Sequence, residues 1–283
     1  MSQTTEFLTL LANAPAVLVR VQAHRGSVPR ESDAWMAVFD QSCLGTVGGG
    51  QLEWQAMAQA RVLLGDPSSA PVLMRYPLGP SMGQCCGGEV HLRYERVSAA
   101  DVPALRQRFD GMRARWPWLV LFGGGHVGAA LVRLLASLPV QVQWIDSRDG
   151  IFPLQLPDNV VSELSEPVQL AVPLMPARAL VLIMSFSHAQ DLDLVAACLS
   201  RQRQNADLGW IGLIGSQSKW ATFRHRLAQR GFTEAEMARV QCPIGLPGIR
   251  GKQPEVIAVS VAAQVLQVLA SGGERADPLE MES

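Results

Sequence analysis

Three glycines between residues 123 and 128 have the spacing of a dinucleotide-binding turn. Gly123, Gly125 and Gly128 satisfy the pattern G-x-G-x-x-G, with His126 inside it, directly after the apolar run 119–122. In such a turn the first glycine permits the bend, the second lets a pyrophosphate approach the backbone, and the third lets the helix pack on the sheet. The helix that follows would offer free N–H groups to phosphate oxygens. The pattern predicts a phosphate-binding turn; the alternative is a tight turn that binds nothing.

Further polar residues follow later apolar runs. The run 140–145 ends in Asp146, where an acid would accept hydrogen bonds from a ribose diol. His188 and Ser216 each follow another apolar run, although His188 could simply begin a helix and Ser216 could simply cap one. Because ligands of open parallel sheets lie beyond the carboxyl ends of the strands, we expect these residues and the glycine turn to share one crevice.

Two adjacent cysteines form the most unusual motif of the N-terminal half. Cys85 and Cys86 lie between Gln84 and Gly87. Adjacent cysteines rarely pair with each other, because the disulfide strains the intervening peptide, and no further Cys or His spacing completes a tetrahedral zinc site. Two thiols in a glycine-flanked loop could present soft sulfur ligands or a redox-sensitive surface. The alternative, two cysteines buried as small apolar residues, is less favoured because glycines offer no side chains to cover them.

Arginines in the segment 23–30 could bind an anion. Arg25 and Arg30 lie where no regular element is expected, and arginine offers a planar fork to phosphate. The alternative is a solvated turn, which composition alone favours.

A second glycine run precedes a helix expected over residues 51–64. Gly49 and Gly50 end this run and could form an anion site at the helix N-terminus. Glu53, in the first turn, could simply complement the helix dipole.

Composition predicts a soluble cytoplasmic protein that binds neither nucleic acid nor membrane. The chain has 283 residues, of which 48% are hydrophobic and 17% charged, with a formal net charge of -1 and a mean hydropathy of +0.13. It has no basic block and few aromatic residues, which disfavours nucleic acid. The longest apolar segment, 256–270, is too short to span a bilayer, and no export signal is visible. Five cysteines favour reduced thiols, and the low charge density weakly suggests a homodimer.

Periodicity predicts two α/β domains. The first combines helices with alternating strands, and the second alternates buried strands with helices, as in a doubly wound parallel sheet. We expect a mixed α/β domain over residues 1–100, a joining segment over 101–117, a Rossmann-like domain over 118–270 and a disordered polar tail over 271–283.

Taken together, the motifs resemble the XdhC/CoxI family of xanthine dehydrogenase accessory proteins. The resemblance implies an N-terminal XdhC/CoxI domain followed by a C-terminal Rossmann domain. One departure is Phe186, where the family more often carries a histidine, so the resemblance implies no metal or acid–base role at this position. The matching segments span nearly the whole chain: 26–30, 45–53, 78–88, 122–128, 144–148, 215–219, 243–245 and 254–258.

The resemblance also implies a function. Such proteins bind the molybdenum cofactor, hold it while a cysteine desulfurase installs its sulfido ligand, and deliver it to apo xanthine dehydrogenase. The glycine turns and Arg25 or Arg30 would then bind the phosphate of molybdopterin, and Cys85 and Cys86 would lie near the molybdenum or the incoming sulfur. The chain would be an accessory protein rather than an enzyme.

Two alternatives stay open at this point. One is an NAD(P)-dependent oxidoreductase that uses Asp146 for the ribose and His188 or a cysteine for proton transfer. The other is a scaffold that binds no small molecule. The sequence leaves open whether the crevice holds NAD(P), another nucleotide or the pterin, and which molybdoenzyme is served.

Overall fold

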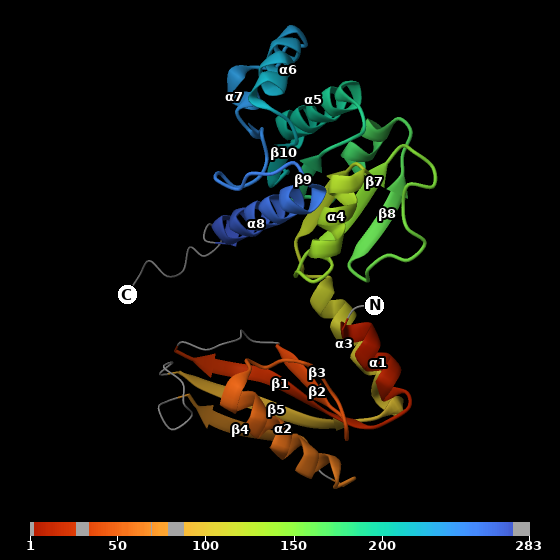
Figure 1. Ribbon diagram of the computed structural model, residues 1–283, viewed down its shortest axis with the longest axis vertical. Coiled ribbons are helices and arrows are strands. Elements are labelled where there is room, and N and C mark those ends of the chain that lie inside the picture. Colours follow the sequence, from red (N-terminus) through yellow and green to blue (C-terminus); the bar gives the residue numbers. More distant parts are fainter. Residues whose placement is uncertain (1–2, 27–33, 69, 79–87, 274–283) are drawn as a thin grey trace. The chain divides into compact units, whose positions relative to one another are not determined.

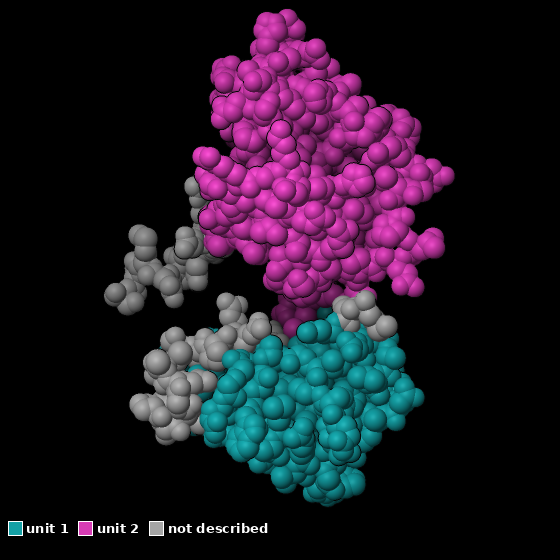
Figure 2. Space-filling model, in the orientation of Figure 1, with its two compact units in different colours: residues 1–111 teal, residues 112–283 magenta. Residues whose placement is uncertain are grey.

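The computed structural model describes residues 3–26, 34–68, 70–78 and 88–273. It divides into two compact units, residues 1–111 and 112–283, which are coloured separately in Figure 2. The division falls within the segment 101–117, which is expected to join the domains. This segment is largely helical, because helix α3 runs from Val102 to Arg113.

Unit 1 contains a five-stranded antiparallel sheet (Figure 1). Its elements are α1 (Gln3–Leu11), β1 (Ala16–Arg25), β2 (Trp35–Val38), β3 (Cys43–Gly45), α2 (Gly50–Leu64), β4 (Val72–Pro77) and β5 (Glu89–Val97), followed by a short 3-10 helix, Ala99–Asp101, before α3. The strands lie in the order β3-β2-β1-β5-β4, and all neighbouring pairs are antiparallel.

Apolar alternation along the strands explains how α2 packs on this sheet. Val17 and Val19 of β1 form one buried cluster with Leu52 and Ala56 of α2. Leu52 and Ala56 are four residues apart and therefore lie on one side of the helix. On α1, the ring of Phe7 contacts those of Trp35, Phe39 and Phe109.

The structure corrects three local predictions in unit 1. β1 continues through Arg25, where a loop is expected, and stays paired with β5 across an irregularity between Val21 and Ala23. No strand is expected from the sequence at β3 or at β4. Both β3 and β4 are edge strands, so only one neighbour constrains each of them.

Unit 2 is built on a six-stranded parallel sheet. Its elements are β6 (Trp118–Phe122), α4 (His126–Leu135), β7 (Gln141–Asp146), β8 (Val160–Leu164), the 3-10 helix η3 (Val168–Leu174), β9 (Leu180–Ile183), α5 (His188–Asn205), β10 (Trp210–Leu213), α6 (Gln217–Gln229), α7 (Glu234–Met237), β11 (Val240–Gln241) and α8 (Pro254–Gly273). The strands lie in the order β11-β10-β9-β6-β7-β8. Counted along the chain within this unit, that order is 6-5-4-1-2-3, which is the order of a Rossmann fold. The predicted doubly wound domain is confirmed.

Helices cover both faces of this sheet (Figure 1). Val120 and Phe122 of β6 belong to the core that α5 and α6 share, whereas Leu119 and Leu121 belong to the core that α4 and α8 share. Successive side chains of a strand point to opposite faces, so a strand buried on both faces must be apolar at every position.

The final helix extends beyond residue 270, the expected end of the Rossmann-like domain. α8 reaches Gly273, whereas residues 274–283 of the expected tail lie outside the described residues. By length and composition the stretch Pro254–Ser271 could cross a membrane, which corrects the expectation that it is too short. Such a helix is weak evidence for a membrane span, and Val261 and Val265 are fully buried in the core that α8 shares with α4. Core packing accounts for the apolar residues on one side of α8, whereas Val259 and Leu266 are 51% and 40% exposed.

Candidate functional site

The glycine turn lies at the point in the sheet of unit 2 where the strand order reverses. β6 pairs with both β7 and β9, so the turn after β6 lies beside the carboxyl ends of both neighbours. Gly123 has φ +124°, and a Cβ there would overlap the carbonyl oxygen of Met184. A Cβ on Gly128 would overlap the carbonyl oxygen of Gly123, whereas one on Gly125 would meet nothing within 4 Å. The first and third glycines therefore have the expected backbone roles, and the second leaves open space; phosphate binding itself stays a prediction.

Trp144 is a positioning residue that the sequence analysis does not identify. Its indole Nε1 donates a 2.9 Å hydrogen bond to the carbonyl oxygen of Gly123, and its side chain is 1% exposed. The backbone N–H of Gly123 in turn donates to the carbonyl oxygen of Ile145, at 2.8 Å. The second strand of the unit thus fixes both sides of the turn.

Asp146 lies at the end of β7, as expected, but its carboxylate already has partners. Oδ2 accepts hydrogen bonds from the N–H of Gly124 at 2.6 Å and from Nη2 of Arg148 at 2.8 Å. Oδ1 accepts from the backbone N–H and from Nε of Arg148, both at 2.9 Å. Burial by itself would raise the pKa of Asp146, but the hydrogen bonds from Arg148 and Gly124 outweigh it and lower the pKa from its ordinary value. The carboxylate is an internal acceptor that holds the turn.

His126, His188 and Ser216 each mark the start of a helix at this edge of the sheet. His126 is the exposed first residue of α4, and His188 is the exposed first residue of α5. The ring of His188 meets that of Phe223 edge-on, with centroids 6.5 Å apart. Ser216 caps α6, since its hydroxyl accepts a hydrogen bond from the N–H of Lys219. The capping role of Ser216 is therefore present, and its role toward a ligand is untested.

A buried ion pair lies between two of these helices. Nζ of Lys219 is 2.6 Å from Oδ2 of Asp191 and 2.8 Å from the carbonyl oxygen of Ile214. Oδ1 of Asp191 accepts hydrogen bonds from the N–H and the hydroxyl of Ser185. The side chains are 11% and 2% exposed, and both residues line a cavity of about 380 Å³ that also touches His188. This pair is not predicted from the sequence, because Asp191 and Lys219 lie 28 residues apart and no motif links them.

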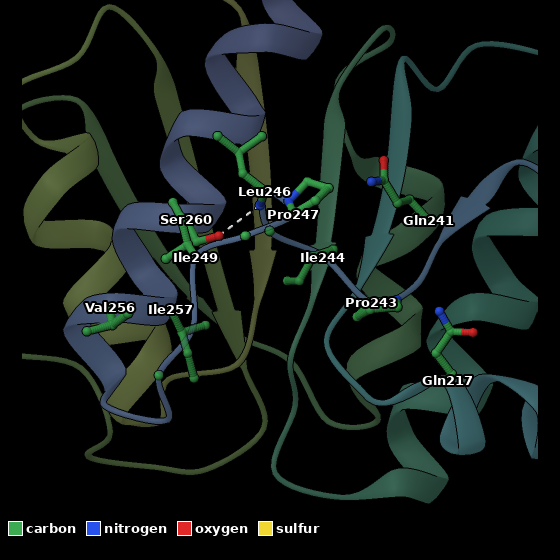
Figure 3. A pocket seen from close by; sticks show the side chains of 13 residues that line it. Gln217, Gln241, Pro243, Ile244, Leu246, Pro247, Ile249, Val256, Ile257 and Ser260 are labelled. Atoms are coloured by element: carbon green, nitrogen blue, oxygen red, sulfur yellow. Dashed lines mark hydrogen bonds between the residues drawn. The ribbon is translucent and has the colours of Figure 1, made fainter.

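A second cavity in unit 2 lies beside the segment that follows β11 (Figure 3). Its volume is about 520 Å³, and Gln217 and Ser260 line it from α6 and α8. The hydroxyl of Ser260 accepts a hydrogen bond from the N–H of Leu246 at 2.8 Å, which fixes the segment to α8. The glycines at 245, 248 and 251 are the sequence signal that could have identified this cavity.

In unit 1 the strand topology brings the flanks of the predicted anion and thiol segments to one end of the sheet. β1 ends at Arg25 and pairs there with Glu89, the first residue of β5. Pro77, the last residue of β4, pairs with Glu89 from the other side. The N–H of Leu78 donates to the carbonyl oxygen of Gly88 at 2.7 Å, so both flanks of the segment 79–87 are held at this end.

The second glycine run follows β3, which ends at Gly45 and pairs there with Met36 of β2. Gly49 and Gly50 have φ +76° and +59°, which favour glycine. The turn before them already has an anionic partner: Oε2 of Glu53 accepts from the hydroxyl of Thr46, from the N–H of Val47 at 3.2 Å and from the N–H of Gly49 at 3.1 Å. Glu53 therefore holds the turn through these hydrogen bonds, and an anion at Gly49 would compete with its carboxylate.

Several predicted site residues lie outside the described residues: Arg30, Gln84, Cys85, Cys86 and Gly87. In the described part of the chain the free cysteines are Cys43, Cys198 and Cys242. Burial raises the pKa of each of these three thiols, so they are not activated as thiolates. The same part of the chain contains no group of three or more His, Cys, Asp or Glu side chains arranged to hold a metal ion.

Comparisons with known proteins agree with this architecture. The crystal structure of a protein described as a xanthine dehydrogenase from Bacillus halodurans matches with a TM-score of 0.73 at 19% identity, over 98% of this chain and 98% of that chain, which shows a shared fold. The uncharacterized protein YqeB of Escherichia coli (strain K12) is 27% identical over 259 residues, which is 90% of this chain. The chain spans 44% of the length of YqeB.

Two family models match the two units separately. The model of the XdhC and CoxI family matches residues 10–77, within unit 1. The model of the XdhC Rossmann domain matches residues 119–265, which is more than half of the chain and lies within unit 2. The chain therefore belongs to the XdhC family.

Proposed function

We propose that this protein carries the molybdenum cofactor as cargo, holds it while a cysteine desulfurase installs the sulfido ligand, and delivers it to apo xanthine dehydrogenase. Membership of the XdhC family supports the broader part of this proposal, a role in the maturation of xanthine dehydrogenase. The finer part, binding and delivery of the cofactor, needs support from the residues themselves.

The observation that carries the proposal is the convergence of unlike chemical groups at one end of the sheet in unit 1. Molybdopterin combines a phosphate, a pterin with many hydrogen-bonding edges and a soft dithiolene–molybdenum centre. Arg25 supplies a cation at this end, and the segment that contains Cys85 and Cys86 leaves the sheet from Leu78 and returns at Gly88. Arginine matches phosphate through paired charge-assisted hydrogen bonds, and thiolates match soft metals and sulfur. The residue types therefore suit this cargo.

The glycine loop at residues 48–50 is a poorer candidate for the phosphate site than the sequence suggests. Glu53 already accepts the N–H groups of Val47 and Gly49, so a phosphate would have to displace a carboxylate. Arg25, which is exposed at the end of β1, is a better candidate for the phosphate. The loop then serves to fix the N-terminus of α2.

Within this proposal Cys85 and Cys86 protect or orient the cargo rather than turn over a substrate. The test compares the Cys85→Ala/Cys86→Ala double variant with wild type after expression in a molybdate-fed host. We expect the double variant to lose most of its bound molybdenum, measured by elemental analysis, and to activate apo xanthine dehydrogenase poorly.

A matched control is Cys43→Ala, which removes a half-buried thiol of the same unit. It should retain wild-type molybdenum content and delivery. The role of the two cysteines is refuted if the double variant binds and delivers the sulfurated cofactor as well as wild type. Native mass spectra of the same samples also report the proposed homodimer and any complex with the desulfurase.

A further inference from the structure

We infer that the crevice of unit 2 binds a nucleotide that is phosphorylated on its ribose, with this phosphate at Arg148, and discriminates against an unmodified ribose diol. The inference concerns a ligand other than the molybdenum cofactor and does not depend on the proposed function. It rests on the residues that follow β7, where the ribose of a nucleotide lies in this fold.

The Asp146 carboxylate, which could bind the two ribose hydroxyls, has no free acceptor position. A carboxylate offers about four lone-pair sites, and Asp146 receives four hydrogen bonds. One comes from the N–H of Gly124 and three come from Arg148, with distances of 2.6–2.9 Å. The side chain of Asp146 is only 2% exposed, so a ribose hydroxyl could reach it only by displacing one of these donors.

Arg148 has donors left on its open side. A guanidinium carries five N–H groups, and the hydrogen bonds to Asp146 use only those on Nε and Nη2. The side chain is 37% exposed, so the remaining N–H groups have access to a ligand. These groups are cationic donors, so they bind the anionic oxygens of a phosphate more strongly than the neutral hydroxyl oxygens of a diol.

The orientation of Arg148 is fixed before any ligand arrives. Its guanidinium carbon lies 5.1 Å from the centroid of the Phe186 ring, while Asp146 holds its edge. Phe186 follows the end of β9, is itself 58% exposed and lines the cavity that also touches His188. A preorganised guanidinium loses little conformational entropy on binding an anion.

Neighbouring backbone leaves room for such a ligand. A side chain on Gly125 would meet no atom within 4 Å, in contrast to one on Gly124, which would lie 2.6 Å from Ile151. The open position is therefore at the start of α4, where a helix N-terminus also favours phosphate groups.

Isothermal titration calorimetry of the full chain with two probes tests the inference. Adenosine 2′,5′-bisphosphate and adenosine 5′-monophosphate differ only by the 2′-phosphate. We expect the bisphosphate to bind on the order of tenfold more tightly, as charge-assisted hydrogen bonds from one arginine would give. Equal affinities, tighter binding of the monophosphate, or no binding of either probe would overturn the inference.

The Arg148→Ala variant separates this role from a merely structural ion pair. Removal of the guanidinium frees two acceptor positions on Asp146, so the preference for the bisphosphate should vanish and the monophosphate should bind at least as well as to wild type. The control Arg133→Ala removes an arginine of α4 that is 66% exposed, and it should keep the wild-type preference. A preference that survives Arg148→Ala would contradict the inference.

A readout on the wild-type protein covers the case in which Arg148→Ala does not fold. The NMR signal of the Arg148 Nε–H group should shift on addition of the bisphosphate and not on addition of the monophosphate. Absence of this selective shift would also overturn the inference. Molybdenum content is measured separately, so failure of the proposed function and failure of this inference remain distinguishable.

Discussion

At the scale of single residues, the three glycines of the turn differ in what they contribute. A Cβ on Gly128 would overlap backbone atoms of Gly123, whereas one on Gly125 would meet open space. We expect Gly128→Ala to destabilise the protein by about 2–3 kcal/mol through overpacking and Gly125→Ala to cost less than about 1 kcal/mol. Urea unfolding measures both. Equal losses in the two variants would show that close packing at Gly128 is not what requires glycine.

The lowered pKa of Asp146 predicts an acid-dependent contribution to stability. Because the folded protein binds the proton less tightly than the unfolded chain does, the stabilisation is fully present above the ordinary carboxyl pKa, about 3.9, and is lost as the pH falls through the lower folded value. The free energy of unfolding of wild type should therefore decline below about pH 4 more steeply than that of Asp146→Asn. Parallel pH profiles for the two proteins would contradict this expectation.

The ion pair between Asp191 and Lys219 predicts that mutations of its two residues have coupled effects on stability. Lys219→Met leaves a buried carboxylate without its counter-ion and should cost on the order of 3–5 kcal/mol. The double variant Asp191→Asn/Lys219→Met should cost less than the sum of the single changes, because it leaves no unpaired charge. Arg230→Ala is the control, since its pair with Asp193 is 45% and 42% exposed, and should cost at most about 1 kcal/mol. A double-mutant cycle without coupling would refute a paired, buried contact.

At the scale of elements, the start of α2 depends on one carboxylate. Glu53→Ala removes the acceptor of the N–H groups of Val47 and Gly49. Hydrogen exchange at these two amides should accelerate by about fivefold, as loss of roughly 1 kcal/mol of local protection implies. Gln51→Ala, an exposed change in the same turn, should leave the exchange unchanged. Unaltered exchange in Glu53→Ala would mean that other contacts hold the turn.

The elements also show where sequence patterns succeed and where they fail. Strands such as β6 and β9 are predictable because burial on both faces makes each of them a continuous apolar run bounded by polar or glycine residues. Helix starts at Ser216 and Thr233 are predictable because their capping residues act locally. The edge strands β3, β4 and β8 are not, since each pairs on one side only and none is buried along its whole length.

The sequence predicts where the residues of the candidate site lie, but not which hydrogen bonds their side chains form. Strand order alone places the glycine turn, Asp146, His188 and Ser216 at the carboxyl edge of one sheet. That Arg148 fills the acceptor positions of Asp146, and that Glu53 fills the glycine turn of unit 1, depends on side-chain orientation, which spacing does not encode. The glycine spacing predicted where the turn lies, but the sequence did not predict the hydrogen-bond partners of Asp146 and Glu53.

At the scale of the whole molecule, the two units offer different chemistry. Unit 1 gathers an arginine and the flanks of a two-cysteine segment at one end of an antiparallel sheet. Unit 2 presents a glycine turn, fixed ion pairs and helix N-termini at the carboxyl edge of a Rossmann sheet. The proposed function assigns the soft metal centre to unit 1, and the further inference assigns a phosphorylated ligand to unit 2.

The most direct test of the central claim is native mass spectrometry of the protein purified from a molybdate-fed host, combined with molybdenum quantification. We predict a bound molybdopterin mass and molybdenum at close to one atom per chain, both lost in Cys85→Ala/Cys86→Ala. A dinucleotide mass without molybdenum, or a protein that acquires no molybdenum in a host that makes the cofactor, would contradict the proposed role as its carrier.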